Sequence, residues 1–393
     1  MTGAARRTIG VVTVARSDYG HLRPVLEAIA GAPELRLLLF VGGMHLEPEF
    51  GLTVREIEAD GWPVAARVPM AETDDRPAGI AASVGAGVEG FGRVLSAQCP
   101  DVLTILGDRF EMLAAAVAAL PLALPVAHIH GGEVSEGAMD NQVRHAITKL
   151  SHLHFVSADV HGRRIAQMGE EPWRIHVVGA PGLDRMRTAD LLSRDALARQ
   201  IGVEPAGRWI VVTFHPVTLE YGDTAEHVHE LLAALEKTDG KLIITYPNAD
   251  TAGRLVIERL EEFAGRHPHC RLVRSLGDRA YLSLLRHADL MVGNSSSGLI
   301  EAPSFELPVV NVGGRQRGRL RGANVVDTGY GRDEILHAIE SALAPGGRDR
   351  LRGMTNPYGD GRAAERIVRV LREVALDRAL VQKRFVDLGG VPS

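Results

Sequence analysis

The feature that most constrains the fold is an alternation of strand-like apolar runs with helical patterns, which occurs twice along the chain. The run from Val102 to Leu106 is continuously apolar, which is typical of parallel strands buried on both faces. We expect a first series of strands near 8–14, 35–41, 102–106, 125–130, 154–157 and 175–178, and a second near 209–213, 241–246, 271–274, 289–293 and 308–312. The alternation predicts parallel sheets built from βαβ units.

The expected architecture is α/β, with two doubly wound Rossmann-like domains facing a cleft. A chain of 393 residues is too long for one ordinary core. We place the N-terminal domain at 1–185 and the C-terminal domain at 186–365. A C-terminal helical segment at 366–393 is long enough to pack back toward the N-terminal domain.

Composition and charge exclude several classes of protein. The formal charge of −5 gives no general attraction for nucleic acid. The apolar stretch from Thr8 to Ala15 is too short for a signal-peptide core or a membrane span. Two cysteines, Cys99 and Cys270, are too few for a disulfide framework or a zinc site. We expect a cytoplasmic protein without nucleic-acid or membrane partners.

Three acids occur where predicted strands give way to helices: Asp108, Glu133 and Asp140. The strands before Asp108 and Glu133 should end at the same edge of one sheet, where open α/β sheets bind ligands. His128, His130 and His145 lie beside these acids in the sequence. The stretch therefore offers proton donors and acceptors whose pKa values neighbours can shift toward neutrality.

The second half carries an anion-site signal in the stretch from Gly293 to Glu301. A strand ends at Gly293, small hydroxyl residues follow, and a helix is expected to begin, so free backbone N–H groups and the helix dipole would point into the cleft. Serine hydroxyls suit a diphosphate, and Glu301 could accept hydrogen bonds from ribose. The alternative is a simple N-cap with serine-rich turn chemistry.

Other polar residues have a functional and an ordinary interpretation. Arg16 and Arg315 each follow a predicted strand and should face the cleft as cationic partners. His215 could reach across the cleft or only cap its strand, Asn248 could be a turn residue, and Arg109 could be a salt-bridge partner. The chain has no Gly-x-Gly-x-x-Gly after a strand with an acid beyond it, so we expect no dinucleotide cofactor.

Taken together, these stretches resemble the hydrolysing UDP-N-acetylglucosamine 2-epimerases, which have a glycosyltransferase-B-like fold. The resemblance runs through nearly the whole chain. The motifs that carry it are Arg16-Ser17-Asp18-Tyr19-Gly20, Gly107-Asp108-Arg109-Phe110-Glu111, His128-Ile129-His130-Gly131-Gly132-Glu133, Asp140 through Arg144-His145, Phe214-His215-Pro216, Asn294-Ser295-Ser296-Ser297, Arg315-Gln316 and Asn356-Pro357-Tyr358-Gly359-Asp360-Gly361.

The resemblance implies a set of site residues and a nucleotide-sugar partner. The residues expected to act in catalysis are Asp108, Glu133, Asp140, His215 and His130. Those expected to contact the substrate or UDP are Arg16, Asp18, Arg109, Arg144, His145, Asn248, Ser295, Ser296, Ser297, Glu301 and Arg315. No metal and no cofactor are expected, and family members suggest a homodimer or homotetramer.

The implied reaction removes the C2 proton of the sugar and expels UDP from C1, giving a 2-acetamidoglucal. Water then adds at C1 and C2 is protonated from the opposite face, yielding UDP and free N-acetylmannosamine or an analogue. We expect Asp108 and Glu133 to share the C2 proton transfer, with His130 nearby. Asp140 and His215 would handle the protons of water and of the leaving group.

One position departs from the family pattern. The animal branch and the non-hydrolysing epimerases carry a catalytic Glu where this chain has His130. That role passes either to Glu133 or to His130 itself. Bacterial relatives with the His-Ile-His-Gly-Gly-Glu form also serve legionaminic acid synthesis, alongside the sialic acid pathway, and use a 2,4-diacetamido-trideoxy sugar on UDP or GDP.

Three rival functions remain at the level of the sequence. A non-hydrolysing epimerase would carry a Thr-rich loop where this chain has Arg109-Phe110-Glu111. A glycosyltransferase of the same architecture would need an acceptor site and has less use for three acids. A non-catalytic nucleotide-sugar sensor would leave Asp108, Glu133 and Asp140 without a role.

Overall fold

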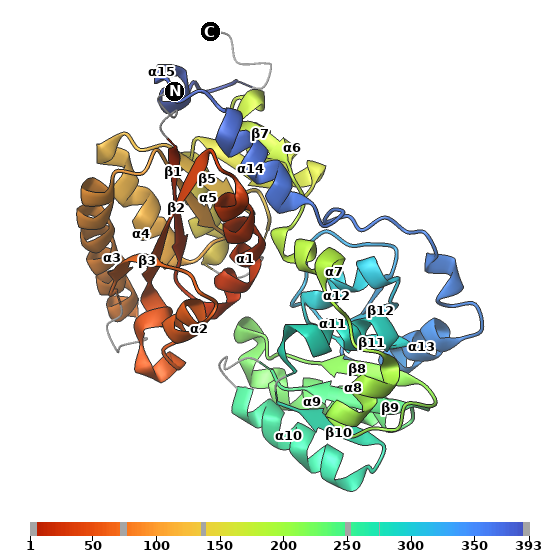
Figure 1. Ribbon diagram of the computed structural model, residues 1–393. Coiled ribbons are helices and arrows are strands. Elements are labelled where there is room, and N and C mark those ends of the chain that lie inside the picture. The colour runs from red at the N-terminus through yellow and green to blue at the C-terminus, as the bar shows by residue number, and fades with distance from the viewer. Residues whose placement is uncertain (1–5, 71–76, 135–138, 248–252, 275, 388–393) are drawn as a thin grey trace. The chain divides into compact units, whose positions relative to one another are not determined.

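The computed structural model describes residues 6–70, 77–134, 139–247, 253–274 and 276–387. The chain divides into two compact units, coloured along the chain in Figure 1. Unit 1 combines the chain up to Arg187 with the segment that begins at Tyr358, and unit 2 is the continuous stretch Thr188–Pro357. The boundaries placed from the sequence were 185 and 365.

Unit 1 contains a seven-stranded sheet in the order β3-β2-β1-β4-β5-β6-β7, in which all neighbours are parallel. Its strands are β1 (Arg7–Thr13), β2 (Leu35–Gly42), β3 (Val64–Val68), β4 (Val102–Leu106), β5 (Val126–Ile129), β6 (Leu153–Val156) and β7 (Ile175–Val177). Its helices are α1 (Arg16–Gly31), α2 (Val54–Ala59), α3 (Pro77–Gln98), α4 (Phe110–Ala119), α5 (Asp140–Leu150), α6 (Asp159–Gln167), α7 (Asp184–Thr188, which ends in unit 2), α14 (Ala363–Glu373) and α15 (Arg378–Val381).

Unit 2 contains a six-stranded parallel sheet in the order β10-β9-β8-β11-β12-β13. Its strands are β8 (Trp209–Thr213), β9 (Lys241–Thr245), β10 (Cys270–Val273), β11 (Leu290–Gly293), β12 (Val309–Val312) and β13 (Val325–Thr328). Its helices are α8 (Arg194–Ile201), α9 (Thr224–Leu235), α10 (Gly253–Arg266), α11 (Gly277–His287), α12 (Ser297–Ile300) and α13 (Arg332–Leu343). The predicted α/β class with two parallel sheets is confirmed.

The two central strands of each sheet define where a ligand can bind. The strand order reverses between β1 and β4 in unit 1 and between β8 and β11 in unit 2. In open α/β sheets the loops that leave the carboxyl ends of such strands diverge and form a crevice. The loops that follow β4, β8 and β11 therefore occupy the positions at which these folds bind ligands.

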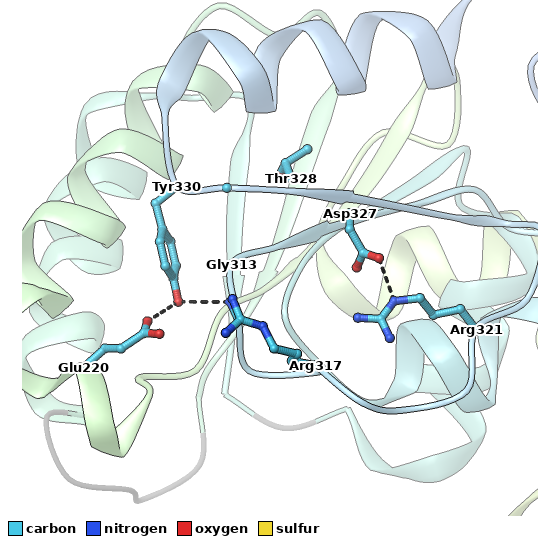
Figure 2. A pocket seen from close by; sticks show the side chains of 9 residues that line it. Glu220, Gly313, Arg317, Arg321, Asp327, Thr328 and Tyr330 are labelled. Atoms are coloured by element: carbon cyan, nitrogen blue, oxygen red, sulfur yellow. Dashed lines mark hydrogen bonds and ion pairs between the residues drawn. The ribbon is translucent and has the colours of Figure 1, made fainter. Parts of the chain in front are cut away.

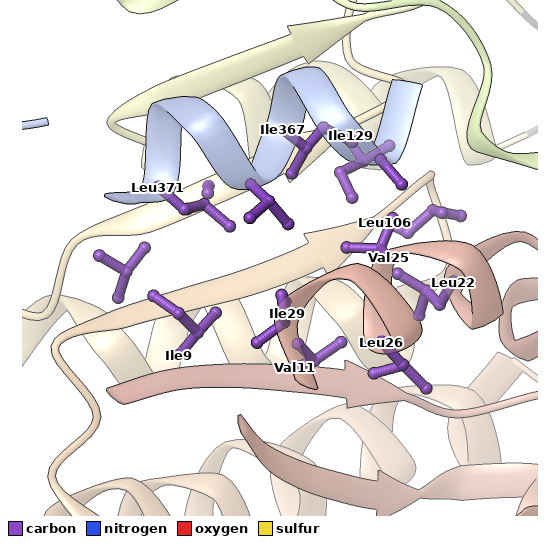
Figure 3. Close-up of a cluster of buried hydrophobic side chains, with 14 of the residues drawn as sticks. Ile9, Val11, Leu22, Val25, Leu26, Ile29, Leu106, Ile129, Ile367 and Leu371 are labelled. Carbon is purple, nitrogen blue, oxygen red and sulfur yellow. The ribbon is translucent and has the colours of Figure 1, made fainter. Parts of the chain in front are cut away.

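Hydrophobic cores cover both faces of the unit 1 sheet. On one face α1 and α14 pack side by side, with Leu22, Ile29, Ile367 and Leu371 fully buried between helices and strands (Figure 3). On the other face α3, α4 and α5 bury a second cluster that includes Phe91 and Met112. The C-terminal helix α14 is thus part of the core of unit 1.

Helix α15 and the residues that follow it are tied to unit 1 by Arg174 and Glu170. Arg174 donates hydrogen bonds to the backbone oxygens of Leu380 and Ala379, both at 2.7 Å. Lys383 Nζ lies 2.8 Å from the carboxylate of Glu170, whose side chain has no exposed surface.

No helix in the described ranges is long and apolar enough to span a bilayer.

Candidate active site

Asp108 and His130 leave the carboxyl ends of the adjacent strands β4 and β5, and Arg144 on α5 connects them. Arg144 pairs with the carboxylate of Asp108 through Nη2 and donates from Nη1 to the backbone oxygen of His130 at 2.8 Å. Its side chain is only 5% exposed, so this connection is held inside the protein. A carboxylate and an imidazole are therefore presented at one sheet edge, as the sequence predicted.

His128, two positions before His130 and within β5, bonds to the backbone of a neighbouring turn. Its Nε2 donates to the backbone oxygen of Gly107 at 2.7 Å, and burial lowers its pKa to about 3, with the backbone hydrogen bond opposing that shift. A neutral, fully buried His128 therefore fixes the turn that carries Asp108.

Glu133 lies within hydrogen-bond distance of His130. Its Oε1 is 2.6 Å from His130 Nδ1 and accepts from Ser157 Oγ at 2.8 Å. Burial opposes ionisation, but the nearby imidazole of His130 and guanidinium of Arg144 outweigh it and hold the pKa of Glu133 well below its usual range. Glu133 is thus a buried carboxylate that stays ionised.

Asp140 starts helix α5 and differs electrostatically from Glu133. Burial and the nearby carboxylate of Asp108 raise the pKa of Asp140. Like charges close together cannot both ionise easily, so one carboxyl group of such a pair holds its proton to higher pH. Asp140 is accordingly suited to donate a proton.

Arg109 is a salt-bridge partner in this structure, the ordinary interpretation left open by the sequence. Its Nη2 is 2.7 Å from Oε1 of Glu111, a carboxylate that is 2% exposed. Glu111, and also Asp18 and Asp140, help to raise the pKa of Arg109 against the opposing effect of burial. A positive charge is thereby fixed beside the acidic groups.

Asp18 and Arg16 occupy different surroundings. The carboxylate of Asp18 accepts from the backbone N–H groups of Val14 and Ala15, both at 2.7 Å, so its oxygens support the turn after β1. Burial raises its pKa to about 6 despite these hydrogen bonds. Arg16 is exposed and its Nε lies 3.5 Å from Glu56.

His145 is half-buried on α5, where burial and the charge of Arg144 lower its pKa.

In unit 2 the ends of β8 and β11 are joined by Asn294. Its Oδ1 accepts from the backbone N–H of His215 at 2.7 Å, and its Nδ2 donates to the backbone oxygen of His215 at 2.8 Å. Burial and the charge of Arg315 lower the pKa of His215 to about 3. His215 therefore carries a neutral imidazole on a backbone that Asn294 holds in place.

Arg315 and Gln316 bring the loop after β12 to the same place. Arg315 Nη1 donates to the backbone oxygen of Asn294 at 3.1 Å, and Gln316 Nε2 donates to it at 2.8 Å. Gly293 must be glycine, because its φ is +129° and a Cβ would lie 2.0 Å from the backbone oxygen of Thr213. Asn294 thus lies at the centre of His215, Arg315 and the three residues Ser295–Ser297, which we call the serine loop.

The helix that follows the serine loop is shorter than the sequence led us to expect. Helix α12 contains only the four residues Ser297–Ile300 and is followed by a 3-10 turn at Ala302–Phe305. A single turn has few aligned peptide dipoles, so the expected contribution of a helix dipole is small. Ser295 and Ser296 remain half-buried beside this turn, and Glu301 lies at its end. The serine hydroxyl groups and the guanidinium of Arg315 are therefore the main polar groups of this loop region.

A pocket of about 450 Å³ in unit 2 is lined by residues that follow β12, such as Gly313 and Arg317, and by Tyr330 after β13 (Figure 2). Tyr330 donates to Glu220 at 2.5 Å, and its ring stacks on His227 with 3.4 Å between the centroids. Arg321 pairs with Asp327 at 2.6 Å on the other wall. The two carboxylates of the pocket, those of Glu220 and Asp327, are therefore already engaged by Tyr330 and Arg321.

Several partners were not anticipated from the sequence. They are Ser157 and His161 beside Glu133, Glu111 beside Arg109, and Asn294 as the junction in unit 2. Only their contacts with distant residues reveal them. Asn248, expected to contact the nucleotide, lies outside the described residues. Within the described ranges no group of three or more His, Cys, Asp or Glu side chains could hold a metal ion.

Comparisons with known proteins place this geometry in context. A sequence model of the UDP-N-acetylglucosamine 2-epimerase family matches residues 27–372. The hydrolysing UDP-N,N'-diacetylbacillosamine 2-epimerase of Legionella pneumophila is 38% identical over 96% of this chain and 98% of its own length. The GDP/UDP-N,N'-diacetylbacillosamine 2-epimerase of Campylobacter jejuni, also hydrolysing, is 34% identical over 98% of this chain and 100% of its own.

The fold has a close counterpart among solved structures. The UDP-GlcNAc 2-epimerase of Neisseria meningitidis, bound to UDP-GlcNAc, superposes with a TM-score of 0.78 at 15% identity. The superposition covers 93% of this chain and 99% of that one. At this identity the likeness concerns the fold.

Proposed function

The chain belongs to the UDP-N-acetylglucosamine 2-epimerase family, and from this premise we propose that it is a hydrolysing epimerase of a UDP-linked 2-acetamido sugar. The observation that carries the proposal is the connection of Asp108 to His130 through Arg144, with Glu133 and Asp140 alongside. Carboxyl and imidazole groups with different proton affinities are what an elimination followed by hydration requires.

The reaction would proceed in two stages. In the first, a base removes the C2 proton, a C1–C2 double bond forms, and the C1–O bond breaks with its electron pair leaving on UDP. In the second, water attacks C1 while an acid protonates C2 from the opposite face. The products are UDP and the free sugar with inverted C2. Asp140 suits the acid role because its pKa is raised.

Groups of unit 2 would stabilise the departing diphosphate. Arg315 supplies a positive charge, and Ser295 and Ser296 supply hydroxyl donors on a loop held by Asn294. Hydrogen bonds and charges aimed at developing negative charge lower the barrier because they need no rearrangement during the reaction. His215 would add a donor in its neutral form, and Glu301 would accept from the ribose hydroxyls.

The names of the relatives support a more specific substrate. Those of Legionella pneumophila and Campylobacter jejuni are named for N,N'-diacetylbacillosamine, so we propose that a 2,4-diacetamido-trideoxy sugar is used alongside or in place of N-acetylglucosamine. The Campylobacter name includes both GDP and UDP. The free product would serve nonulosonic acid biosynthesis in the cytoplasm, and the enzyme would act as a homodimer or homotetramer.

A substrate panel tests this function. The protein is incubated separately with UDP-N-acetylglucosamine and with the UDP- and GDP-linked 2,4-diacetamido sugars, and products are identified by NMR. Free sugar with inverted C2 together with nucleoside diphosphate supports the proposal. An epimerised nucleotide sugar would show a non-hydrolysing epimerase, and release that requires an added acceptor would show a glycosyltransferase. No turnover with any of the three would contradict the proposal.

A further inference from the structure

The backbone of His130 adopts a conformation that non-glycine residues rarely accept. Its φ is +62°, in the left-handed region. Its N–H donates to the backbone oxygen of Phe155 at 3.0 Å, and its C=O accepts from Arg144 at 2.8 Å. A non-glycine residue in this region is strained and persists only where its surroundings impose the conformation. His130 is therefore held at a defined position by its neighbours.

The turn that follows brings the side chain of Glu133 to His130. Gly132 has a φ of +73°, and a Cβ at this position would lie 2.4 Å from the backbone oxygen of His161. Only glycine fits so close to another backbone segment. This packing fixes the backbone between His130 and Glu133 and so holds their side chains in contact.

The contact determines which nitrogen of His130 carries hydrogen. An ionised carboxylate can only accept, so His130 Nδ1, 2.6 Å from Glu133 Oε1, must be the donor. The same Glu133 oxygen accepts from Ser157, whose Oγ is 2.9 Å from His161 Nδ1. A neutral His130 then has its lone pair on Nε2. In the described part of the chain, Nε2 has no hydrogen-bond partner.

We propose that His130 Nε2 accepts the C2 proton of the substrate and that Glu133 positions the imidazole through Nδ1. This inference rests on the proposed function. As the C2–H bond breaks, its proton goes to Nε2 and its electron pair forms the C1–C2 double bond. The C1–O bond breaks and its electron pair leaves on the β-phosphate of UDP. The imidazolium afterwards returns its proton to water.

The geometry separates His130 from the two other candidates for this role. Glu133 is 8% exposed and its lowered pKa makes it a weak base. The carboxylate of Asp108 is paired with Arg144, which holds its charge in an ion pair. The sequence-based expectation that Asp108 and Glu133 share this proton transfer is therefore replaced by a base at His130 and a positioning carboxylate at Glu133.

Two substitutions remove the base while preserving the backbone. His130→Asn keeps an amide donor for Glu133 and tolerates positive φ, and His130→Gly adopts positive φ without strain. Each variant is compared with the matched control His269→Asn, an exposed histidine in unit 2. UDP affinity is measured by calorimetry, and UDP release from the nucleotide sugar is measured under single-turnover conditions with C2–H and C2–D substrates.

We expect both His130 variants to bind UDP within about twofold of the wild type and to release it from the sugar about 10²–10⁴-fold more slowly. Their isotope effect should be at least that of the wild type, because C2–H cleavage limits the rate. Release within about threefold of the wild-type rate by either variant that still binds UDP would overturn the inference. If the wild type itself releases no UDP, the proposed function fails and the inference fails with it.

The positioning role of Glu133 has its own readout. Glu133→Gln retains an acceptor for Nδ1 but removes the charge, so kcat should fall roughly tenfold to a hundredfold with KM little changed. The split between the two constants is the readout, because a residue that only supported the fold would change KM and UDP affinity together with kcat. An unchanged kcat, or a loss of UDP affinity that matches the loss of kcat, would exclude the positioning role.

Discussion

Arg144 pairs with Asp108, and the pair joins helix α5 to the loop that follows strand β4. The guanidinium also reaches the backbone oxygen of His130 with its other nitrogen. The planar, forked guanidinium of arginine can make both contacts at once. The single ammonium group of a lysine would make them poorly. The relative positions of a carboxylate and an imidazole therefore depend on the shape of one side chain as well as on its charge.

The first prediction concerns this shape. Arg144→Lys should lower kcat by about tenfold to a hundredfold, because the ammonium group keeps the charge but loses one of the two contacts. The exposed Arg163, on α6, offers a matched control through Arg163→Lys. Steady-state kinetics on both variants decide the matter. Equal, near-wild-type kcat values would show that the charge of residue 144 suffices.

The second prediction concerns the carboxylate of the pair. Asp108→Asn should keep the fold and UDP binding but lower turnover by about 10²–10⁴-fold, since an amide does not balance the buried charge of Arg144, which also contacts the backbone of His130. Calorimetry with UDP and a turnover assay on the same preparation measure both quantities. Near-wild-type turnover would remove Asp108 from the catalytic set.

The third prediction concerns the diphosphate. Arg315→Ala should weaken UDP binding by roughly tenfold to a hundredfold, corresponding to about 1.5–3 kcal/mol for a charge-assisted contact. Arg317→Ala, two positions along the same loop, removes an exposed guanidinium and should change UDP affinity much less. Calorimetry compares the two variants with the wild type. Equal weakening by both would indicate general electrostatic attraction.

A companion measurement tests the metal-free character of this site. UDP should raise the melting temperature of the wild type in the presence of EDTA, because a ligand that binds only the folded state stabilises it by mass action. The comparison is made with and without added magnesium. Stabilisation that disappears with EDTA would show that a divalent cation takes part in UDP binding.

The fourth prediction concerns pH. Burial opposes ionisation of Glu170, but hydrogen bonds from His154, Lys149 and Lys383 lower its pKa from 4.5 to about 2. A lowered folded-state pKa stabilises the protein above pH 4.5, and this contribution is lost as the pH falls toward about 2. Glu170→Gln should therefore be less stable than the wild type at pH 7, on the order of 1–3 kcal/mol, and the difference should shrink in acid. Urea unfolding between pH 7 and pH 2.5 measures it. A difference that stays constant across this range would contradict the assigned pKa.

The sequence predicted most of the two sheets because their central strands are continuously apolar. It missed β3 and β13, which are edge strands with polar or charged residues such as Arg67 and Asp327. Each edge strand pairs on one side only, so one face and one edge tolerate polar side chains and the apolar run is interrupted. Pairing with β2 and β12 is what identifies them as strands.

The identity of the site residues was more predictable than their arrangement. Asp108, His130, Glu133 and Asp140 were singled out because they follow strands of one sheet. The pairing of Glu133 with His130 depends on a left-handed φ and on the space around Gly132, which no local pattern shows. Likewise, the place of Asn294 depends on the contact between β8 and β11.

The discontinuity of unit 1 has a consequence for how the protein matures on the ribosome. Asp184, before the insertion of unit 2, accepts hydrogen bonds from the N–H groups of Ala363 and Ala364 at the start of α14. Unit 2 is continuous and can fold as soon as it emerges, since domains generally fold as units during synthesis. Unit 1, whose sheet is translated first, must wait until α14 has been translated before its core is complete. Nascent chains stalled before residue 363 should therefore contain a folded unit 2 and an exposed apolar face on α1, to which chaperones can bind.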